Sequence, residues 1–361
     1  MSTATLPLAG SPRAWRQIEL LGAAGLLYLL FLLYLTLGLH TEMMRGDVLN
    51  YWKRSWELST PYDAWWPPGY PFLIAVTRTL TLNKLPPLAV MGLISGLSYL
   101  IATGTIYQTA HDLRLRPAFQ IALVFAVYPF VGLTDSIYPL ADITAIALFS
   151  VCVLAVERRR WATFTLCAAL ALLVHKATWF LLPPLLLTAL LRHRESRLLL
   201  PLAGVPLLLW IVAGGFHHGD FLWFVRWSIN HLVVSRSALP LCDGLLGPFL
   251  TGNIYKMAKG ILVWTTVLVA LVTLFYSYRL SFWSGVAISL SLILMAAVLN
   301  QREIWVVVRF SKVLVIPLAY VLLQTDLRPA LRTNSLFVVF FLLCLVSNLL
   351  FGRYMAVLAA R

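Results

Sequence analysis

The repetition of long apolar runs constrains the fold of this chain more than any other feature of its sequence. Most runs are about 17 to 25 residues long, the length at which an α-helix crosses the hydrocarbon core of a bilayer. Of the 361 residues, 60% are hydrophobic and only 12% are charged, so water cannot be the solvent for most of the surface. The sequence therefore predicts an all-α integral membrane protein.

The pattern predicts roughly eleven transmembrane helices packed as a single polytopic domain over the whole chain. The expected spans lie near residues 18–39, 86–108, 117–133, 141–156, 161–175, 178–191, 198–215, 260–278, 282–299, 306–324 and 335–351. Residues 69–82 are apolar but too few to cross comfortably, so they are predicted to form an interfacial or re-entrant helix. The long loops 40–85 and 216–259 are expected to form the roof of the active site.

Short arginine-bearing connections predict the orientation of the spans. They contain Arg114 and Arg116, Arg158 to Arg160, Arg192, Arg194 and Arg197, and Arg328 and Arg332. Such connections are typical of the cytoplasmic side, so both long loops are expected to face outward. By this topology the outer segments carry more basic than acidic residues, so the net charge of +14 favours an anionic substrate.

The first long loop contains a carboxylate suited to catalysis. Asp47 follows the first span by roughly eight residues, which predicts a position just above the membrane surface, where it could act as a general base. The alternatives are a solvated loop residue or a helix cap. Residues 48–58 have the pattern of a helix that lies in the interface. One face of that helix carries Val48, Tyr51, Trp52 and Trp56.

The same loop ends in the sequence WPPGYP, residues 66–71. Trp66 and Tyr70 continue an aromatic belt of the kind found at membrane–water interfaces. The three prolines stiffen the chain where it re-enters the membrane. Interfacial anchoring explains these aromatic residues, but it does not explain the nearby acids.

Three ionisable residues are expected at the outer ends of later spans. Asp142 lies at or just inside a span, which makes it a functional candidate, although it could instead cap its helix. His175 and Lys176 interrupt the apolar sequence LLVHKATWFLLPP. Desolvating Lys176 is costly unless an anion compensates its charge, or unless the ammonium snorkels to the interface. A packed, hydrogen-bonded histidine is the alternative for His175.

Two late arginines predict a phosphate-binding site. Arg302 and Arg309 are seven residues apart and so share one face of a helix. Guanidinium groups match phosphate oxygens well, although Glu303 could instead pair with one of them. The sequence shows no spacing typical of a zinc site. It leaves any need for a divalent metal open.

Three features together resemble the GT-C superfamily of membrane glycosyltransferases, which use lipid-phosphate-linked sugars as donors. They are Asp47 followed by Tyr51, the WPPGYP segment, and the late sequence RFSKVLVIPLAY, residues 309–320, which is similar to an RYLLPLLP-like stretch of bacterial members. The resemblance implies that Asp47 is the catalytic base. Members often have two adjacent acids at this place, so Glu42 is the candidate partner here.

The resemblance implies an inverting transfer of a hexose, mannose or a relative, from a polyprenyl-phosphate donor to an acceptor hydroxyl. Arg309, Lys176 and Arg302 would stabilise the departing phosphate. Sugar and acceptor contacts are expected from Glu42, Tyr51, Asp142, His175, Trp66 and Tyr70. The expected location is the bacterial inner membrane, with the active site on its outer face.

The expected partners are the lipid-linked donor, a glycolipid, glycan or protein acceptor, and membrane lipids. No nucleic acid is expected. Two other functions fit the same sequence features. One is a transporter or flippase of a lipid-linked saccharide, and the other is a polysaccharide polymerase or ligase.

Overall fold

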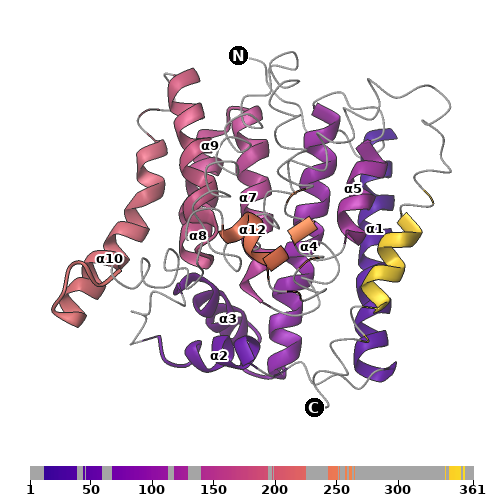
Figure 1. Cartoon of the computed structure of the whole chain (residues 1–361), viewed down its shortest axis with the longest axis horizontal. Helices are drawn as coiled ribbons and strands as arrows, with labels where there is room; N and C mark the ends of the chain where they lie inside the picture. The colour runs from indigo at the N-terminus through magenta and orange to yellow at the C-terminus, as the bar shows by residue number, and fades with distance from the viewer. Residues whose placement is uncertain are drawn as a thin grey trace.

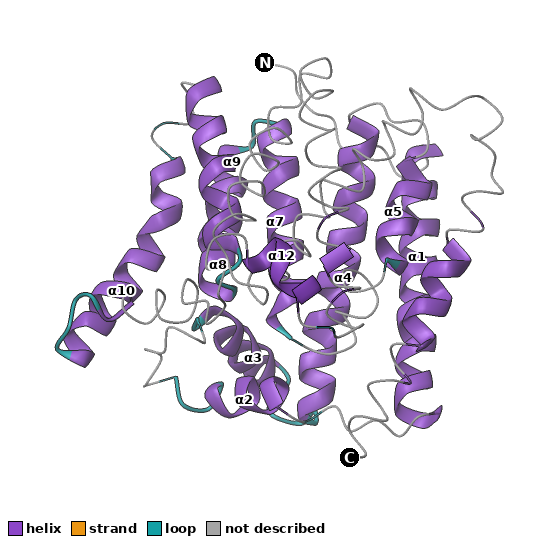
Figure 2. Cartoon of the chain, in the orientation of Figure 1, coloured by secondary structure: helices purple, strands orange, loops and turns teal. Residues whose placement is uncertain are grey.

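The computed structural model describes most of the first 224 residues and two short later stretches. The described segments are residues 12–38, 46–58, 67–112, 118–128, 140–193, 199–224, 243–250 and 341–350, with a few single residues between them. All regular structure in these segments is helical (Figure 2). Long helices stand side by side, and two shorter helices cross one end of the bundle (Figure 1).

The helices agree closely with the expected spans in the part of the chain that the structure describes. In chain order they are α1 (Pro12–Leu33, continued by a π-helical turn, Tyr34–Gly38), α2 (Gly46–Arg54), α3 (Gly69–Leu80), α4 (Pro87–Asp112), α5 (Ala118–Val127), α7 (Ala141–Glu157), α8 (Trp161–Val174), α9 (Thr178–Arg192), η3 (Leu200–Gly204), α10 (Val205–His218) and α12 (Asp243–Leu250). The predicted short helix over 69–82 is α3. The expected spans at 282–299 and 306–324, and most of 260–278, lie outside the described residues.

Three helical segments are long and apolar enough to cross a membrane by length and composition: Ala14–Leu37, Pro87–Asp112 and Leu200–His218. Shorter apolar helices accompany them, among them α5 and α8. These helices support a membrane protein. The full count of eleven spans stays a prediction.

α4 is the centre of the bundle, and it packs against α7, α5, α1 and α3. Small and hydroxyl-bearing residues allow this close packing, as is usual between membrane helices. The Ser98 hydroxyl bonds to Thr144 of α7 at 3.1 Å, and the Tyr28 hydroxyl of α1 donates to the Gly92 carbonyl at 3.1 Å. α1 and α10 are far less buried than α4, and they lie at opposite edges of the described bundle (Figure 1).

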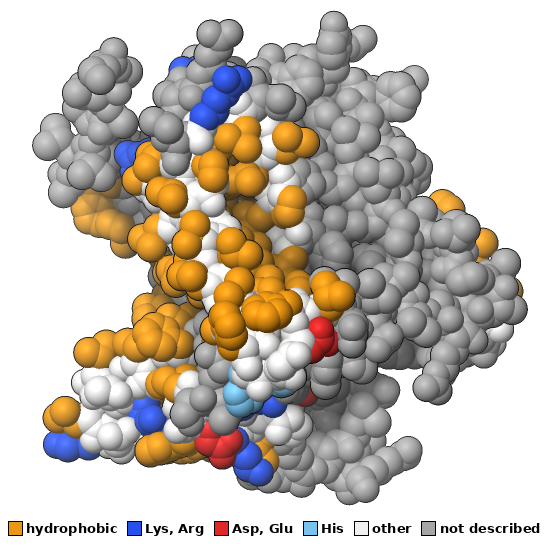
Figure 3. Space-filling model, turned by 90° about the vertical axis from the view of Figure 1, so that its left-hand side faces the viewer, with side chains coloured by type: hydrophobic (Ala, Val, Ile, Leu, Met, Phe, Trp, Pro, Cys, Tyr) orange, Lys and Arg blue, Asp and Glu red, His pale blue; other side chains and the backbone are white. Residues whose placement is uncertain are grey.

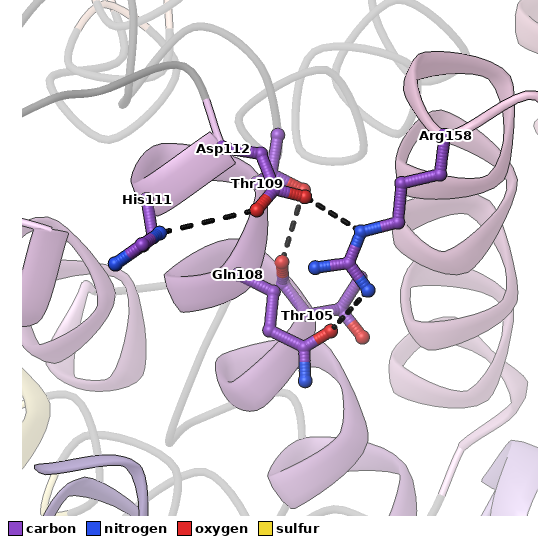
Figure 4. Close-up of polar contacts among 6 residues, drawn as sticks. All are labelled: Thr105, Gln108, Thr109, His111, Asp112 and Arg158. Carbon is purple, nitrogen blue, oxygen red and sulfur yellow. Dashed lines mark hydrogen bonds and ion pairs between the residues drawn. The ribbon is translucent and has the colours of Figure 1, made fainter. Parts of the chain in front are cut away.

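A polar cluster joins the end of α4 to the end of α7 (Figure 4), away from the end of the bundle that α2 and α3 cross (Figure 1). Arg158 donates from Nε to Asp112 Oδ2 at 2.6 Å and from Nη1 to Gln108 Oε1 at 3.1 Å. His111 Nδ1 lies 3.9 Å from Asp112 Oδ1. Charge-assisted hydrogen bonds of this length are among the stronger polar interactions in proteins. The cluster therefore fixes the register of the two central helices.

We predict that Asp112→Asn destabilises the protein by about 0.5 to 1 kcal/mol, because it removes the carboxylate of a partly exposed ion pair with Arg158. The apparent melting temperature in detergent measures the effect. Arg160→Gln is the matched control, since Arg160 is exposed and outside the cluster. Equal melting temperatures for the wild type and Asp112→Asn would show that the cluster contributes no stability.

Candidate active site at the end of the bundle near helices α2 and α3

Polar side chains from four separate segments meet where α2 and α3 cross the bundle (Figure 1). Tyr51 comes from α2, Tyr70 from α3 and Asp142 from the first turn of α7, while His175 follows α8. These four residues are called the polar site below. Because they are distant in sequence, only the folded chain brings them together.

Asp142 and His175 form the buried part of the polar site. The carboxylate oxygen Oδ1 lies 3.8 Å from His175 Nε2, and the two side chains are only 12% and 13% exposed. This distance is too long for a direct hydrogen bond. His175 Nδ1 accepts a hydrogen bond from the Ala177 amide at 3.1 Å. Nδ1 is thus unprotonated, and the ring proton sits on Nε2, facing the carboxylate.

The turn that carries His175 and Lys176 is held rigidly between α8 and α9. The buried Thr178 hydroxyl bonds to the carbonyls of His175 at 2.7 Å and Ala171 at 2.9 Å. Trp179 adds a bond from its indole nitrogen to the Leu172 carbonyl at 2.7 Å. Lys176 is half-buried within this turn. Its position is therefore set by the packed ends of two helices.

Tyr51 lies close enough to both Asp142 and Asp47 for their charges to affect its hydroxyl group. Its ring contacts Tyr70 edge to face, with centroids 4.9 Å apart. Burial raises the pKa of Tyr51 well above its usual value, and the nearby charges of Asp142, Tyr70 and Asp47 raise it further. Burial likewise raises the pKa of Tyr70. Both phenols therefore stay protonated at neutral pH, so Tyr51 can serve as a hydrogen-bond donor but not as a base.

Asp47 differs from Asp142 in its surroundings. It is exposed in the first turn of α2, directly after Gly46, whose φ of +53° requires the left-handed conformation that glycine favours. Asp142 is buried beside His175. One carboxylate of the region is thus accessible from solvent, and the other is enclosed.

A helix is present where the interfacial helix was expected, but part of its apolar side is buried in the protein and part is exposed. Val48 and Tyr51 are buried, whereas Trp56 is largely exposed and follows the end of α2 at Arg54. Val48 and Tyr51 are therefore part of the protein core. α3 packs against α2 and covers that part of the face.

Gly69 sets the position of Tyr70. A Cβ atom at residue 69 would lie 2.7 Å from both the carbonyl carbon and the oxygen of Leu173, at the end of α8. Only glycine permits so close an approach of two backbones. The requirement for glycine at position 69 was not predicted from the sequence. Its place directly after Pro68, at the start of α3, was the available signal.

Three helices begin at this end of the bundle without a side-chain cap. The N-cap residues of α3, α7 and α9 are Pro68, Leu140 and Ala177, and none makes a side-chain cap hydrogen bond. Asp142 is therefore not the N-cap of its helix. The positive end of a helix dipole favours an anion near such a helix start.

Comparison with solved structures gives a match over most of the chain. The chain is similar to ArnT from Cupriavidus metallidurans in its crystal structure bound to undecaprenyl phosphate, with a TM-score of 0.58. The sequence identity is 14%, and the match covers 96% of this chain and 72% of ArnT. The chain shares the ArnT fold. No protein-family model and no curated protein sequence gives a significant match.

The ArnT-like part that the structure describes does not include every predicted site residue. Glu42, Trp66, Arg302 and Arg309 lie outside the described residues, as does most of the loop 216–259. Their roles stay predictions. Among the described residues, no group of three His, Cys, Asp or Glu side chains could hold a metal ion.

We predict that Gly69→Ala moves the first turn of α3 away from α8 and costs about 1 to 3 kcal/mol, as is usual for overpacked sites. The matched control is Gly22→Ala in α1, where a new Cβ atom would have no neighbour within 4 Å. Thermal unfolding of both variants in detergent measures the difference. A Gly69→Ala protein as stable as Gly22→Ala would contradict the close contact with Leu173.

Proposed function

We propose that this protein is a membrane glycosyltransferase that transfers a sugar from a polyprenyl-phosphate donor to an acceptor hydroxyl. One observation carries the proposal: an exposed carboxylate, an enclosed Asp142–His175 pair and a half-buried lysine lie at one end of a bundle with the ArnT fold. The structure of ArnT contains undecaprenyl phosphate, a lipid phosphate of the kind that the proposed donor carries. This likeness agrees with the resemblance inferred from Asp47, Tyr51 and the WPPGYP segment.

Asp47 acts as the general base. The acceptor oxygen attacks the anomeric carbon of the sugar on the face opposite the phosphate, and the carboxylate takes the hydroxyl proton. The bond between the anomeric carbon and the phosphate oxygen breaks, and polyprenyl phosphate leaves with the electron pair. Attack from the opposite face inverts the anomeric configuration. The exposure of Asp47 supports this role, because an acceptor must reach the base from outside.

Lys176 and the uncapped starts of α3, α7 and α9 stabilise the negative charge that develops on the leaving phosphate. The half-buried position of Lys176 supports this role, since a partly desolvated cation interacts more strongly with an anion. Arg309 and Arg302 complete the phosphate site in the proposal.

Asp142, His175 and Tyr51 bind hydroxyl groups of the sugar or acceptor. The carboxylate accepts hydrogen bonds, the His175 Nε2 proton is held toward Asp142, and the protonated Tyr51 can donate. Tyr70 is fully buried against Tyr51 and contributes by holding that ring in place. Glu42 and Trp66 line the same region in the proposal. The transferred sugar is a hexose, with mannose as the first candidate.

The end of the bundle that carries the polar site faces the outer side of a bacterial inner membrane. Arg158, Arg159, Arg160 and Arg197 support this orientation, because basic residues in short connections mark the cytoplasmic side. An impermeant thiol reagent on intact cells tests it. In a background with Cys242→Ser, which removes the native cysteine of the outer loop, we expect labelling of Asp63→Cys and no labelling of Arg159→Cys. The reverse pattern would overturn the orientation.

The decisive test of the proposed reaction uses purified protein, a panel of radiolabelled polyprenyl-phosphate sugars and a total lipid extract. Transfer of label from one donor to an acceptor, with release of polyprenyl phosphate, is the expected result. A flippase would leave every donor chemically intact. Transfer only from oligosaccharide-linked donors would indicate a polymerase or ligase instead.

We predict that Asp47→Asn folds normally but loses roughly 10²- to 10⁴-fold in transfer rate, because the amide cannot accept the acceptor proton. Turnover of the labelled donor measures the loss. The control is Glu19→Gln, an equal charge change on an exposed residue of α1. Near-normal turnover in Asp47→Asn would place the base elsewhere, with Asp142 and Glu42 as the next candidates.

We predict that Lys176→Gln and Arg309→Ala each slow transfer strongly. A preorganised hydrogen-bond donor that stabilises negative charge in the transition state contributes roughly 3 to 4 kcal/mol in well-studied sites. Arg309→Lys should recover only part of the rate, because a lysine lacks the guanidinium fork. Turnover and donor affinity measure both effects. If Glu303→Gln is as damaging as Arg309→Ala while donor affinity is unchanged, Arg309 has a structural role only.

A further inference from the structure

The far end of α3 presents an apolar face that no described part of the protein covers. Phe72, Val76 and Leu80 recur every four residues along α3, so they share one side of the helix. All three are exposed, as is Leu82 in the following turn; Leu80 and Leu82 are 78% and 71% exposed. We call residues 72–84 the α3 ledge.

The ledge projects beside the membrane-spanning helices. The space-filling view in Figure 3 shows a projecting arm at the lower end of the molecule, with hydrophobic side chains on its upper side, a hollow above them, and Lys or Arg side chains lower down. This arrangement suits a helix at the lipid–water boundary. Its apolar side would meet acyl chains, and its basic side would meet head groups.

Arg78 provides a fixed positive charge on this ledge. Its guanidinium carbon lies 3.3 Å from the centre of the Trp56 ring, and Nη1 donates to Ser55 Oγ at 3.3 Å. Its Nε is buried without a hydrogen-bond partner, and no carboxylate among the described residues pairs with it. Desolvation lowers the pKa of Arg78 from its usual value. A cation that is partly desolvated and held on an aromatic ring is suited to an external anion.

The turn after α3 adds a second cation and an unusual leucine. Leu82 has a φ of +54°, a conformation that costs an ordinary side chain roughly 1 to 2 kcal/mol. Glycine or asparagine would avoid most of this cost. The turn keeps a leucine that points away from the protein, followed two residues later by the exposed Lys84. Insertion of Leu82 into lipid would offset the strain.

We infer that the α3 ledge binds an anionic phospholipid of the surrounding leaflet. Arg78 and Lys84 bind the phosphate and its negative head group, and an acyl chain lies along Phe72, Val76 and Leu80. Charge complementarity and the apolar face together favour a phospholipid, because a free phosphate would leave the apolar side chains in water. The position at the boundary of the bundle favours a lipid over a protein partner.

This site is separate from the proposed transfer site. Tyr70 lies in the first turn of α3, and Arg78 and Leu80 lie in its last turn. The eight residues from Tyr70 to Arg78 make about two turns, so the two residues lie about 12 Å apart along the helix axis. The phospholipid at the ledge is proposed as a ligand separate from the sugar donor, and the test below therefore omits the donor.

The test uses the full-length protein in lipid nanodiscs and a photoreactive phosphatidylglycerol whose diazirine lies near the head group. Mass spectrometry reports labelling of the peptide that contains residues 72–84, and competition with unlabelled lipid gives the affinity. We expect phosphatidylglycerol to compete far better than phosphatidylcholine. The combined change Arg78→Gln with Lys84→Gln should weaken binding by roughly 30-fold, since each basic residue at an anionic surface contributes a factor of roughly five.

Two further variants keep the test specific. Trp56→Ala should weaken binding while all charges remain, because it removes the ring that orients Arg78. Arg159→Gln with Arg197→Gln changes the same net charge at the other end of the bundle and should leave labelling of the 72–84 peptide unchanged. No sugar donor is present, so the result is independent of the proposed transfer reaction.

Three results would overturn the inference. The first is equal competition by phosphatidylglycerol and phosphatidylcholine. The second is unchanged labelling in the Arg78 and Lys84 double variant. The third is displacement of the probe by millimolar inorganic phosphate alone, which would show a phosphate site rather than a phospholipid site.

Discussion

The hydrocarbon environment governs where this protein can place its polar groups. Backbone amides and carbonyls must be satisfied within each segment that crosses a bilayer, so the described chain is helical and charged side chains gather at the ends of the helices. The two ends of the helix bundle differ in their polar contacts. At one end Arg158 and Asp112 bind each other and close the contact between α4 and α7. At the other end three helices begin without side-chain caps around the Asp142–His175 pair.

The geometry of the polar site depends on one close backbone contact. Gly69 brings the start of α3 against Leu173, and this contact places Tyr70 beside Tyr51 and next to the turn that carries His175. Thr178 and Trp179 hold that turn through bonds to the end of α8. The site is thus built from rigid helix ends and a short turn, which suits a reaction that depends on preorganised charge.

α3 serves two regions at once. Its first turn supports the polar site, and its last turn carries the ledge with Arg78 stacked on Trp56. Because the helix is short, a lipid bound at the ledge would restrain the same element that positions Tyr70. In the proposal, the lipid at the ledge and the polar site thus share this one helix.

The sequence by itself determined the all-helical membrane class, the positions of most described helices and the short helix over 69–82, because apolar length and charge placement are local properties. It also singled out Asp47, Asp142, His175 and Lys176 as ionisable residues at helix ends. It could not pair Asp142 with His175, bury Tyr51 against Tyr70 or require glycine at position 69. Those features depend on contacts between segments far apart in the chain, and only the packing of α2, α3, α7 and α8 decides which side chains meet.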